Sequence, residues 1–250
     1  MSLLVSRYFL AIKINAYEQE LEDSIRINKH ELTYKSKKHI AYSYIDPVTH
    51  QKHKHLDSFE KGSKLALLFN QHELIKAKLA HYRSLWNSSF VQPCPKLDLN
   101  KLKKTRTSFI TKELYDRLIP NSNPREIKRP NPYNGNVFRS KSERELAELL
   151  DEIGVEYKYE PLLTLNDIDM YPDFVCFIPE IGIGFIIEHF GMIDNANYAE
   201  TTIRKFRVFT SLGLIPGVDI LFTYEKTDVP QTADYFRNSI NFILDNICSF

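Results

Sequence analysis

The chain has 250 residues, of which 43% are hydrophobic and 26% are charged, and its formal net charge is +1. This length allows one large domain or two smaller ones, and the composition is that of a folded globular protein rather than a disordered one. No apolar run reaches the roughly 18–20 residues that span a bilayer, and three widely spaced cysteines predict neither a disulfide framework nor a zinc site. We therefore expect a cytoplasmic protein.

The small net charge conceals an uneven distribution. Residues 1–130 carry 24 lysines and arginines against 13 acidic residues, whereas residues 131–250 carry 9 against 19. The first part is therefore a candidate for contact with a polyanion, and the second has carboxylates available for a metal ion. Two differently charged solvated surfaces would give the same counts, so charge alone does not decide between these interpretations.

The pattern over residues 1–120 predicts a basic helix–hairpin–helix region that binds nucleic acid or a partner protein. Its apolar first residues are interrupted by Arg7 and Lys13 and precede no small-residue cleavage site, which favours the start of a helix or strand over a signal peptide. Hydrophobic spacing and turn residues then predict three elements: a helix over 16–27, a hairpin over 31–45, and a long helix over 60–87 that breaks near Asn70.

A proline-rich stretch separates this region from the rest of the chain. Residues 120–136 hold four prolines, so we expect no regular element to continue through them, and we place a linker at 121–136. The remaining residues, 137–250, are expected to form the second domain.

The second domain is predicted to be an α/β (α+β) domain with a central mixed sheet flanked by helices. Its first helix is expected to begin with Ser142 as the N-cap and to end at Gly154. The expected elements in chain order are a helix over 140–153, strands over 155–164, 171–178 and 183–190, a helix over 197–211, a strand over 219–224 and a helix over 231–247.

Two carboxylates occupy positions in this pattern that packing alone does not explain. Asp173 begins an apolar strand after Pro172, and Glu188 ends the next apolar strand. A buried carboxylate needs a partner, because burying it alone costs several kcal/mol. If the two strands form a hairpin around 179–182, Asp173 and Glu188 meet and can share a divalent cation. Oxygen ligands of this kind suit Mg²⁺ or Mn²⁺.

These residues resemble the motifs of the PD-(D/E)XK nuclease superfamily, which has the restriction-endonuclease-like fold. Pro172-Asp173 matches the PD pair, Glu188 matches the second acidic position, and Glu143 in RSKSERELAELL matches the glutamate of the first helix. The strings YPDF, EHFGMIDNANY and LFTYE look like a bacterial and phage subgroup marked by "WEHFG". The resemblance implies metal ligands at Asp173, Glu188 and Glu143, and a role in phage or host-defence nucleic-acid metabolism.

The family's lysine is absent from its usual place. That position, two residues after Glu188 on the same strand face, holds Phe190. In several branches of the family the lysine lies on the following helix, and Lys205 is the natural candidate here. Tyr198 and Thr202 share its helical face.

Three residues are candidate accessories: Tyr198, His189 and Glu225. His189 points away from Glu188 if the strand stays regular, and Glu225 ends a later strand as an ion-pair or rim residue. Each site residue also has a structural alternative. These are strand-end capping for Asp173, an ion pair with Lys205 or Arg204 for Glu188, a helix first-turn acid for Glu143, a solvated helix face for Lys205 and a packed core residue for His189.

The expected function is Mg²⁺- or Mn²⁺-dependent hydrolysis of phosphodiester bonds, with DNA favoured over RNA. Glu143, Asp173, Glu188 and Lys205 are the expected catalytic residues. The alternative is a degenerate nuclease-like fold that binds nucleic acid or a protein, and a protein partner or a homo-oligomer stays open. Candidate contacts to the nucleic-acid backbone come from one basic run: Lys101, Lys103, Lys104 and Arg106.

Overall fold

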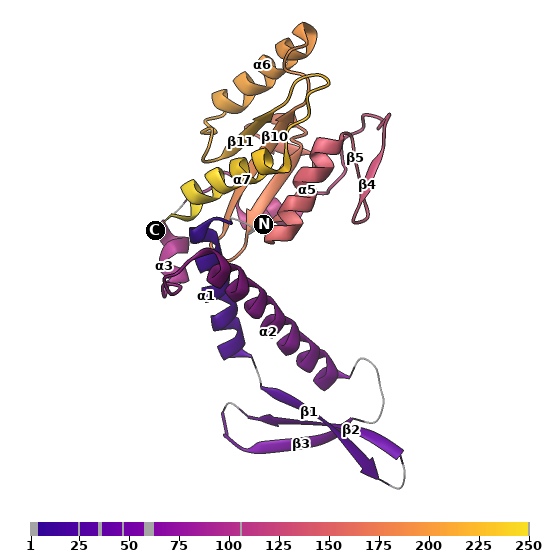
Figure 1. Ribbon diagram of the computed structural model, residues 1–250, viewed down its shortest axis with the longest axis vertical. Coiled ribbons are helices and arrows are strands. Elements are labelled where there is room, and N and C mark those ends of the chain that lie inside the picture. The colour runs from indigo at the N-terminus through magenta and orange to yellow at the C-terminus, as the bar shows by residue number, and fades with distance from the viewer. Residues whose placement is uncertain are drawn as a thin grey trace. The chain divides into compact units, whose positions relative to one another are not determined.

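The computed structural model describes residues 5–24, 26–34, 37–46, 48–57, 63–105 and 107–249 (Figure 1). These residues form a mixed α/β protein with seven helices and four sheets. No described helix combines the length and the apolar character needed to cross a bilayer. The described residues divide into two compact units: unit 1 holds 10–97, and unit 2 holds 5–9 and 98–249.

The division lies before the linker that the prolines predict at 121–136. Residues 98–120 belong to unit 2 because they pack on its sheet. Ile110 forms a β-bridge with Gly184, and the Ser108 hydroxyl donates a hydrogen bond of 2.8 Å to the Gly184 carbonyl. The proline-rich stretch is thus an internal segment of unit 2.

Two helices of unit 1 pack against each other: α1 (Arg7–Asp23) and α2 (Lys64–Ser89). Tyr17 and Tyr82 stack with ring centroids 5.6 Å apart, and Arg83 pairs with Glu18 at 2.7 Å. Helix α1 begins and ends earlier than the predicted 16–27, because an apolar stretch before residue 16 is buried. Helix α2 continues through the predicted break at Asn70, where an exposed asparagine costs only a few tenths of a kcal/mol of helix propensity.

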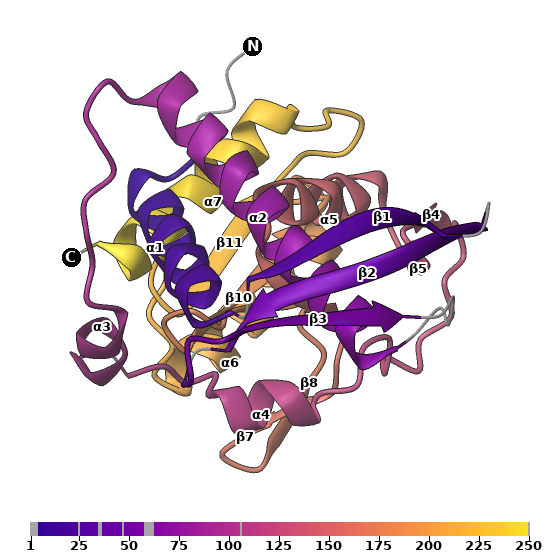
Figure 2. The same cartoon turned by 90° about the horizontal axis from the view of Figure 1, so that it is seen from below.

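Unit 1 also contains a three-stranded antiparallel sheet in the order β1-β2-β3 (Figure 2). Its strands are β1 (Ile27–Tyr34), β2 (Lys37–Ile45) and β3 (Lys52–Asp57). The predicted hairpin corresponds to β1 and β2, whereas β3 was not predicted. Asp46 forms the turn before β3, since its side chain accepts the amide hydrogens of Val48 at 2.7 Å and Thr49 at 2.9 Å.

Four short elements begin unit 2: α3 (Leu99–Thr105), α4 (Lys112–Arg117), β4 (Asn131–Tyr133) and β5 (Asn136–Phe138). Strands β4 and β5 form a hairpin at the end of the proline-rich stretch, where no regular element was predicted. Its two turn residues, Asn134 and Gly135, have positive φ angles of 47° and 79°. An Asn-Gly pair is the strongest short-range sequence signal for a two-residue hairpin turn. The sequence therefore indicated this hairpin, although it was not predicted.

The main sheet of unit 2 has four strands in the order β11-β10-β9-β6. They are β6 (Glu156–Tyr159), β9 (Phe174–Ile178), β10 (Ile183–Phe190) and β11 (Ile220–Tyr224). Strand β10 pairs antiparallel with β9 and parallel with β11, so the sheet is mixed, as predicted. The strand predicted over 155–164 is interrupted at Glu160, whose φ is +42°, and a separate hairpin of β7 (Leu163–Leu165) and β8 (Ile168–Met170) follows.

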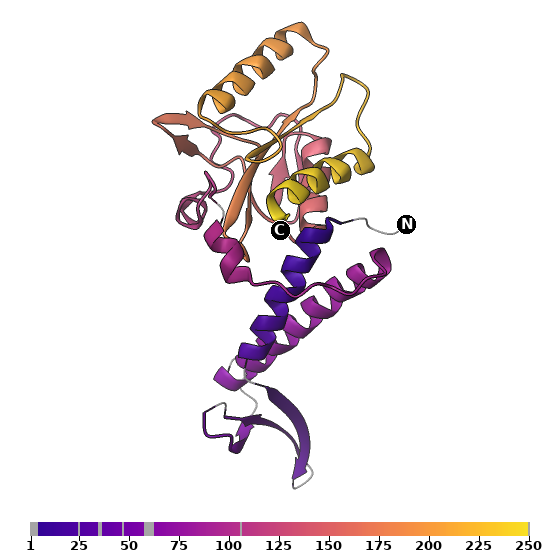
Figure 3. The same cartoon turned by 90° about the vertical axis from the view of Figure 1, so that its left-hand side faces the viewer.

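Three helices flank this sheet: α5 (Lys141–Ile153), α6 (Ala196–Ser211) and α7 (Ala233–Cys248) (Figure 3). Helix α6 packs on one face, where Phe206 contacts Phe222, and α7 packs on the other, where Phe236 contacts His189. The N-cap of α5 is Ser140 rather than the predicted Ser142, because the Ser140 hydroxyl accepts the amide hydrogen of Glu143 at 3.1 Å.

Candidate active site

The hairpin of β9 and β10 brings Asp173 and Glu188 together. The register pairs Phe174 with Ile187, which places Asp173 beside Glu188 at the end of both strands. Oδ2 of Asp173 accepts the amide hydrogen of His189 at 2.7 Å, and Oε2 of Glu188 accepts the amide hydrogen of Asp173 at 3.4 Å. Each carboxylate is therefore fixed by the backbone of the other strand.

Both carboxylates are buried. Glu188 is 0% exposed and Asp173 is 9% exposed. Burial, and then the charge of the neighbouring Glu188, raise the pKa of Asp173 well above its usual range. Burial also raises the pKa of Glu188, although Lys205 opposes that shift. Two like charges in a poorly solvated place favour the approach of a cation.

Lys205 on α6 supplies one such cation. Its ammonium group donates a hydrogen bond to Oε1 of Glu188 and forms an ion pair with it. Burial lowers the pKa of Lys205, but Glu188 and Asp173 raise it more, so the net pKa lies above its ordinary value. Lys205 is thus protonated at neutral pH, and it acts as a fixed positive charge rather than as a base.

Phe190 is a core residue. It is 2% exposed, and its ring stacks on Phe222 and Tyr224 with centroids 5.8 Å and 5.6 Å away. The position two residues after Glu188, where the resemblance leads us to expect a lysine, therefore holds a side chain that packs between β10 and β11. Lys205 reaches Glu188 from α6, on the face where Phe206 packs.

Glu143 lies on α5, and its carboxylate is held by the backbone amide of Arg139 and by the hydroxyl of Tyr159. Its Oε2 accepts hydrogen bonds from the Tyr159 hydroxyl at 2.6 Å and from the Arg139 amide at 3.1 Å. Its charge contributes to the raised pKa of Asp173 and Glu188. Glu143 therefore influences the carboxylate pair electrostatically.

His189 and Glu225 form a second cluster on the α7 side of the sheet. Nδ1 of His189 lies 3.0 Å from the Thr223 hydroxyl, and Nε2 lies 3.4 Å from Oε1 of Glu225. The Ser142 hydroxyl donates to Oε2 of Glu225 at 2.8 Å. Burial raises the pKa of Glu225, but His189 and Ser142 lower it more, so Glu225 is ionised at neutral pH. Period-two alternation explains why His189 faces away from Glu188.

Tyr198, near the start of α6, closes the space between α6 and the end of β10. Its hydroxyl accepts the amide hydrogen of Gly191 at 3.3 Å. It shares its helix face with Thr202, whose hydroxyl bonds to the Tyr198 carbonyl at 3.1 Å, and with Lys205. Among the described residues, Tyr198 forms no hydrogen bond to either carboxylate, and its hydroxyl contacts the backbone just after β10.

A cleft of about 610 Å³ is lined by Glu143, His189 and Tyr198, whereas Asp173, Glu188 and Lys205 are not among its lining residues. Acidic and basic side chains both line it, and the basic ones come from the proline-rich stretch that was predicted as a linker. The charged lining residues are Arg125, Glu126, Lys128, Arg129, Arg139, Glu143 and Glu225, and His189, Gly191 and Tyr198 lie among them. The run PREIKRP displays these charges in the sequence, but their position beside Glu143 and His189 was not predicted.

The donor set fits a hard divalent cation with few protein ligands. Among the described residues, no hydrogen bond reaches Oδ1 of Asp173, and no three acidic, histidine or cysteine side chains are arranged to hold one metal ion. Mg²⁺ commonly binds one or two carboxylates and keeps water or phosphate oxygens as its other ligands. The pair of Asp173 and Glu188 meets that requirement, and Glu143 stands outside it.

The predicted nucleic-acid contacts lie on or next to α3. Lys101 and Lys103 are exposed there, whereas the side chain of Lys104 and the whole of Arg106 lie outside the described residues. None of these residues lines the cleft as the structure describes it.

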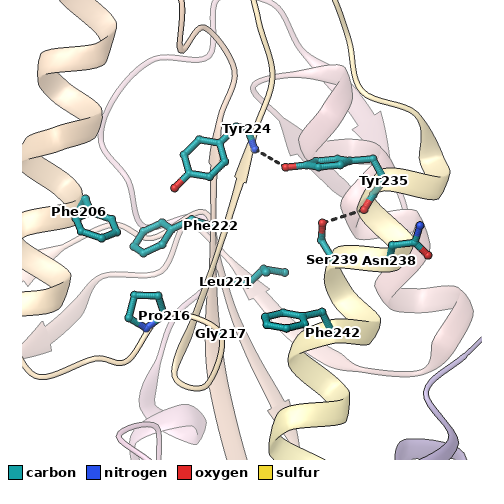
Figure 4. A pocket seen from close by; sticks show the side chains of 10 residues that line it. All are labelled: Phe206, Pro216, Gly217, Leu221, Phe222, Tyr224, Tyr235, Asn238, Ser239 and Phe242. Atoms are coloured by element: carbon teal, nitrogen blue, oxygen red, sulfur yellow. Dashed lines mark hydrogen bonds between the residues drawn. The ribbon is translucent and has the colours of Figure 1, made fainter.

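A second cavity, of about 540 Å³, lies between α6, β11 and α7 (Figure 4). It is lined by aromatic and small residues such as Phe206, Phe222 and Phe242. The Tyr235 hydroxyl accepts the amide hydrogen of Tyr224 at 3.0 Å. No charged side chain lines it. This cavity therefore does not fit a metal or a phosphate.

Comparisons with known proteins give one partial similarity. No family model matches the chain, and no solved structure matches it. Over 101 residues, or 40% of its length, the chain is 33% identical to the uncharacterized protein MJ1519 of Methanocaldococcus jannaschii. The matched part spans 8% of that protein, so the chain is similar to a small portion of a much longer one.

Proposed function

We propose that this protein is a Mg²⁺-dependent nuclease with a restriction-endonuclease-like core, acting on DNA in preference to RNA. The observation that carries the proposal is the pair of buried carboxylates on β9 and β10, Asp173 and Glu188, with the Lys205 ammonium held against Glu188. Two acids and a cation at one strand end fit the needs of phosphodiester hydrolysis.

A Mg²⁺ ion bound by Asp173 and Glu188 would supply Lewis acidity to the scissile phosphate and lower the pKa of a bound water. The protein's own contribution is to hold these carboxylates in place beside one cation. The His189 amide fixes Asp173, and Lys205 opposes the rise in the pKa of Glu188 that burial causes.

Lys205 has a second role when phosphate enters the site. Its raised pKa keeps it protonated, so it neutralises negative charge that develops on the phosphate oxygens instead of removing a proton from water. Glu143 adds a fixed negative charge near the pair and holds the start of α5 through Tyr159 and Arg139.

The test is cleavage of labelled single-stranded and duplex DNA and of RNA, with Mg²⁺, with Mn²⁺ and with a chelator. Asp173→Ala and Glu188→Ala are each expected to lower the rate by at least about a hundredfold. Glu200→Ala, which removes an exposed carboxylate of α6, is the matched control and is expected to keep the wild-type rate. Full activity in either site variant would contradict the assignment.

One observation favours a second function, that of a degenerate nuclease fold that binds nucleic acid without cutting it. Phe190 fills the lysine position with core packing, and Lys205 is engaged by Glu188. Titration with Mn²⁺ in the absence of phosphate separates the two, because a degenerate site binds no metal. Saturable Mn²⁺ binding that is lost in Asp173→Ala supports the nuclease.

A further inference from the structure

The cleft lined by Glu143, His189 and Tyr198 has a basic wall, formed by Arg125, Lys128 and Arg129. All three side chains are exposed, and none forms an ion pair with another described residue. Exposed arginines and lysines that line a cleft without acidic partners are available to an anionic ligand. We call residues 125–129 the basic wall.

The backbone of the basic wall is held by one buried ion pair. Arg139 binds Glu160 at 2.6 Å, and the two side chains are 19% and 6% exposed. The remaining nitrogens of Arg139 donate to the carbonyls of Glu126 at 2.9 Å and Arg125 at 2.5 Å. Arg139 therefore holds the backbone of the basic wall to Glu160. The side chains of Arg125, Lys128 and Arg129 take no part in these contacts and can bind a ligand.

The same ion pair connects the wall to the carboxylate site. The Glu160 amide donates to the Asp173 carbonyl at 2.9 Å, and the Glu160 side chain accepts from Asn123 at 2.8 Å, next to Pro124. The first residues of the stretch are also anchored, since the Ser122 amide donates to the Glu160 carbonyl at 3.0 Å. The wall is thus placed before any ligand arrives, at a position set by the strand end that carries Asp173.

We infer that the basic wall binds the phosphodiester backbone of a nucleic acid and directs it along the cleft to Asp173 and Glu188. The inference rests on the proposed function for its choice of ligand. It assigns the backbone contact to Arg125, Lys128 and Arg129, which lie in the proline-rich stretch, and it makes Arg139 and Glu160 positioning residues. Contacts of this kind read charge and spacing rather than base sequence.

The test is the salt dependence of binding, measured by fluorescence anisotropy with a labelled DNA oligonucleotide, single-stranded and duplex, and with RNA of the same sequence. A chelator is present throughout, so neither metal nor cleavage enters the measurement. The triple variant Arg125→Ala, Lys128→Ala, Arg129→Ala is expected to lower the slope of log K against log salt by about 2 to 3, because each lost phosphate contact removes about 0.7 to 0.9.

The matched control removes three exposed cations elsewhere in unit 2, Lys112→Ala, Arg117→Ala and Arg207→Ala, with the same change in net charge. It is expected to keep most of the wild-type slope. An unchanged slope in the wall variant, or an equal loss in both variants, would overturn the inference, since equal loss indicates general charge attraction. Both variants change exposed side chains, and thermal unfolding verifies their fold.

The positioning role has its own readout. Arg139→Lys keeps the charge but removes the forked geometry that ties Glu160 to the wall. It is expected to weaken oligonucleotide binding while the wall charges are all present, and wild-type affinity in that variant would contradict the positioning role of Arg139. Wild-type protein that binds but does not cut with Mg²⁺ would contradict the proposed function and leave this inference standing.

Discussion

Replacing Lys205 with methionine tests how far the site depends on its one internal cation. The change keeps the length of the side chain and removes the charge that faces Glu188. Glu188 has a side chain 1% exposed, whereas that of Lys205 is 39% exposed. Removing one partner of a fully buried pair costs about 3–5 kcal/mol, and exposed pairs contribute about 0.2–1 kcal/mol. With one partner buried and the other partly solvated, we expect Lys205→Met to destabilise the metal-free protein by about 2 kcal/mol.

The assay is urea unfolding at neutral pH, analysed as a double-mutant cycle with Glu188→Gln. In the Gln background the buried charge is gone, so Lys205→Met is expected to cost less than about 0.5 kcal/mol. Arg207→Met, at an exposed position of α6, is the control, and it is expected to stay within about 0.5 kcal/mol of wild type. Additive effects of Lys205→Met and Glu188→Gln would refute the idea that Lys205 stabilises an ionised Glu188.

Three further predictions address the same chain. Asp173→Asn removes a charge that burial and Glu188 oppose, so in a chelator it is expected to raise stability by on the order of 1 kcal/mol in thermal unfolding, and a lower melting temperature would contradict this. Gly184→Ala places a Cβ 2.6 Å from the Ile110 Cβ and is expected to cost about 1–3 kcal/mol in urea unfolding; wild-type stability would show that residues 108–110 do not pack there. Burial raises the pKa of Glu18, but Lys96 and Arg83 lower it more, so the net pKa lies below 4.5. The ion pairs of Glu18 therefore stabilise the fold above pH 4.5, and this stabilisation is lost as the pH falls through the lowered pKa of the folded protein. Glu18→Gln is therefore expected to weaken the acid dependence of unfolding, and an unchanged dependence would contradict that pairing.

The second half of the fold was predictable because its signals are local. Strand β10 matches the predicted bounds 183–190, and α5, α6 and β11 match within one residue at each end. An apolar run with turn residues on both sides defines a buried strand without reference to distant residues. The hairpin that joins Asp173 to Glu188 followed from the same local pattern.

The errors lie where tertiary contacts override the local signal. The prolines of 120–136 indicated a linker, but Arg139 and Glu160 hold that stretch against unit 2. An ion pair between residues 21 positions apart produces no periodic pattern in the sequence, so it could not be predicted. The N-cap of α5 was misplaced because Ser140 and Ser142 are both good caps, and Ser142 instead donates to Glu225, 83 residues away.

The candidate site was predicted in part for the same reason. The motif spacing identified Asp173 and Glu188, and the family resemblance pointed to Lys205 on the following helix. The structure brings these three residues together, and the strand period placed His189 on the opposite face. The basic wall was missed, because its position over the cleft depends on contacts between segments distant in sequence.

The most direct test of the account is the initial rate of DNA cleavage by wild-type protein and by Asp173→Asn, compared at the same Mg²⁺ concentration and with folding verified by thermal unfolding. The account predicts Mg²⁺-dependent cleavage by wild type and a loss of at least about a hundredfold in the variant, which is nevertheless more stable. Equal rates in the two proteins, or no metal-dependent cleavage of DNA or RNA by wild type, would contradict it.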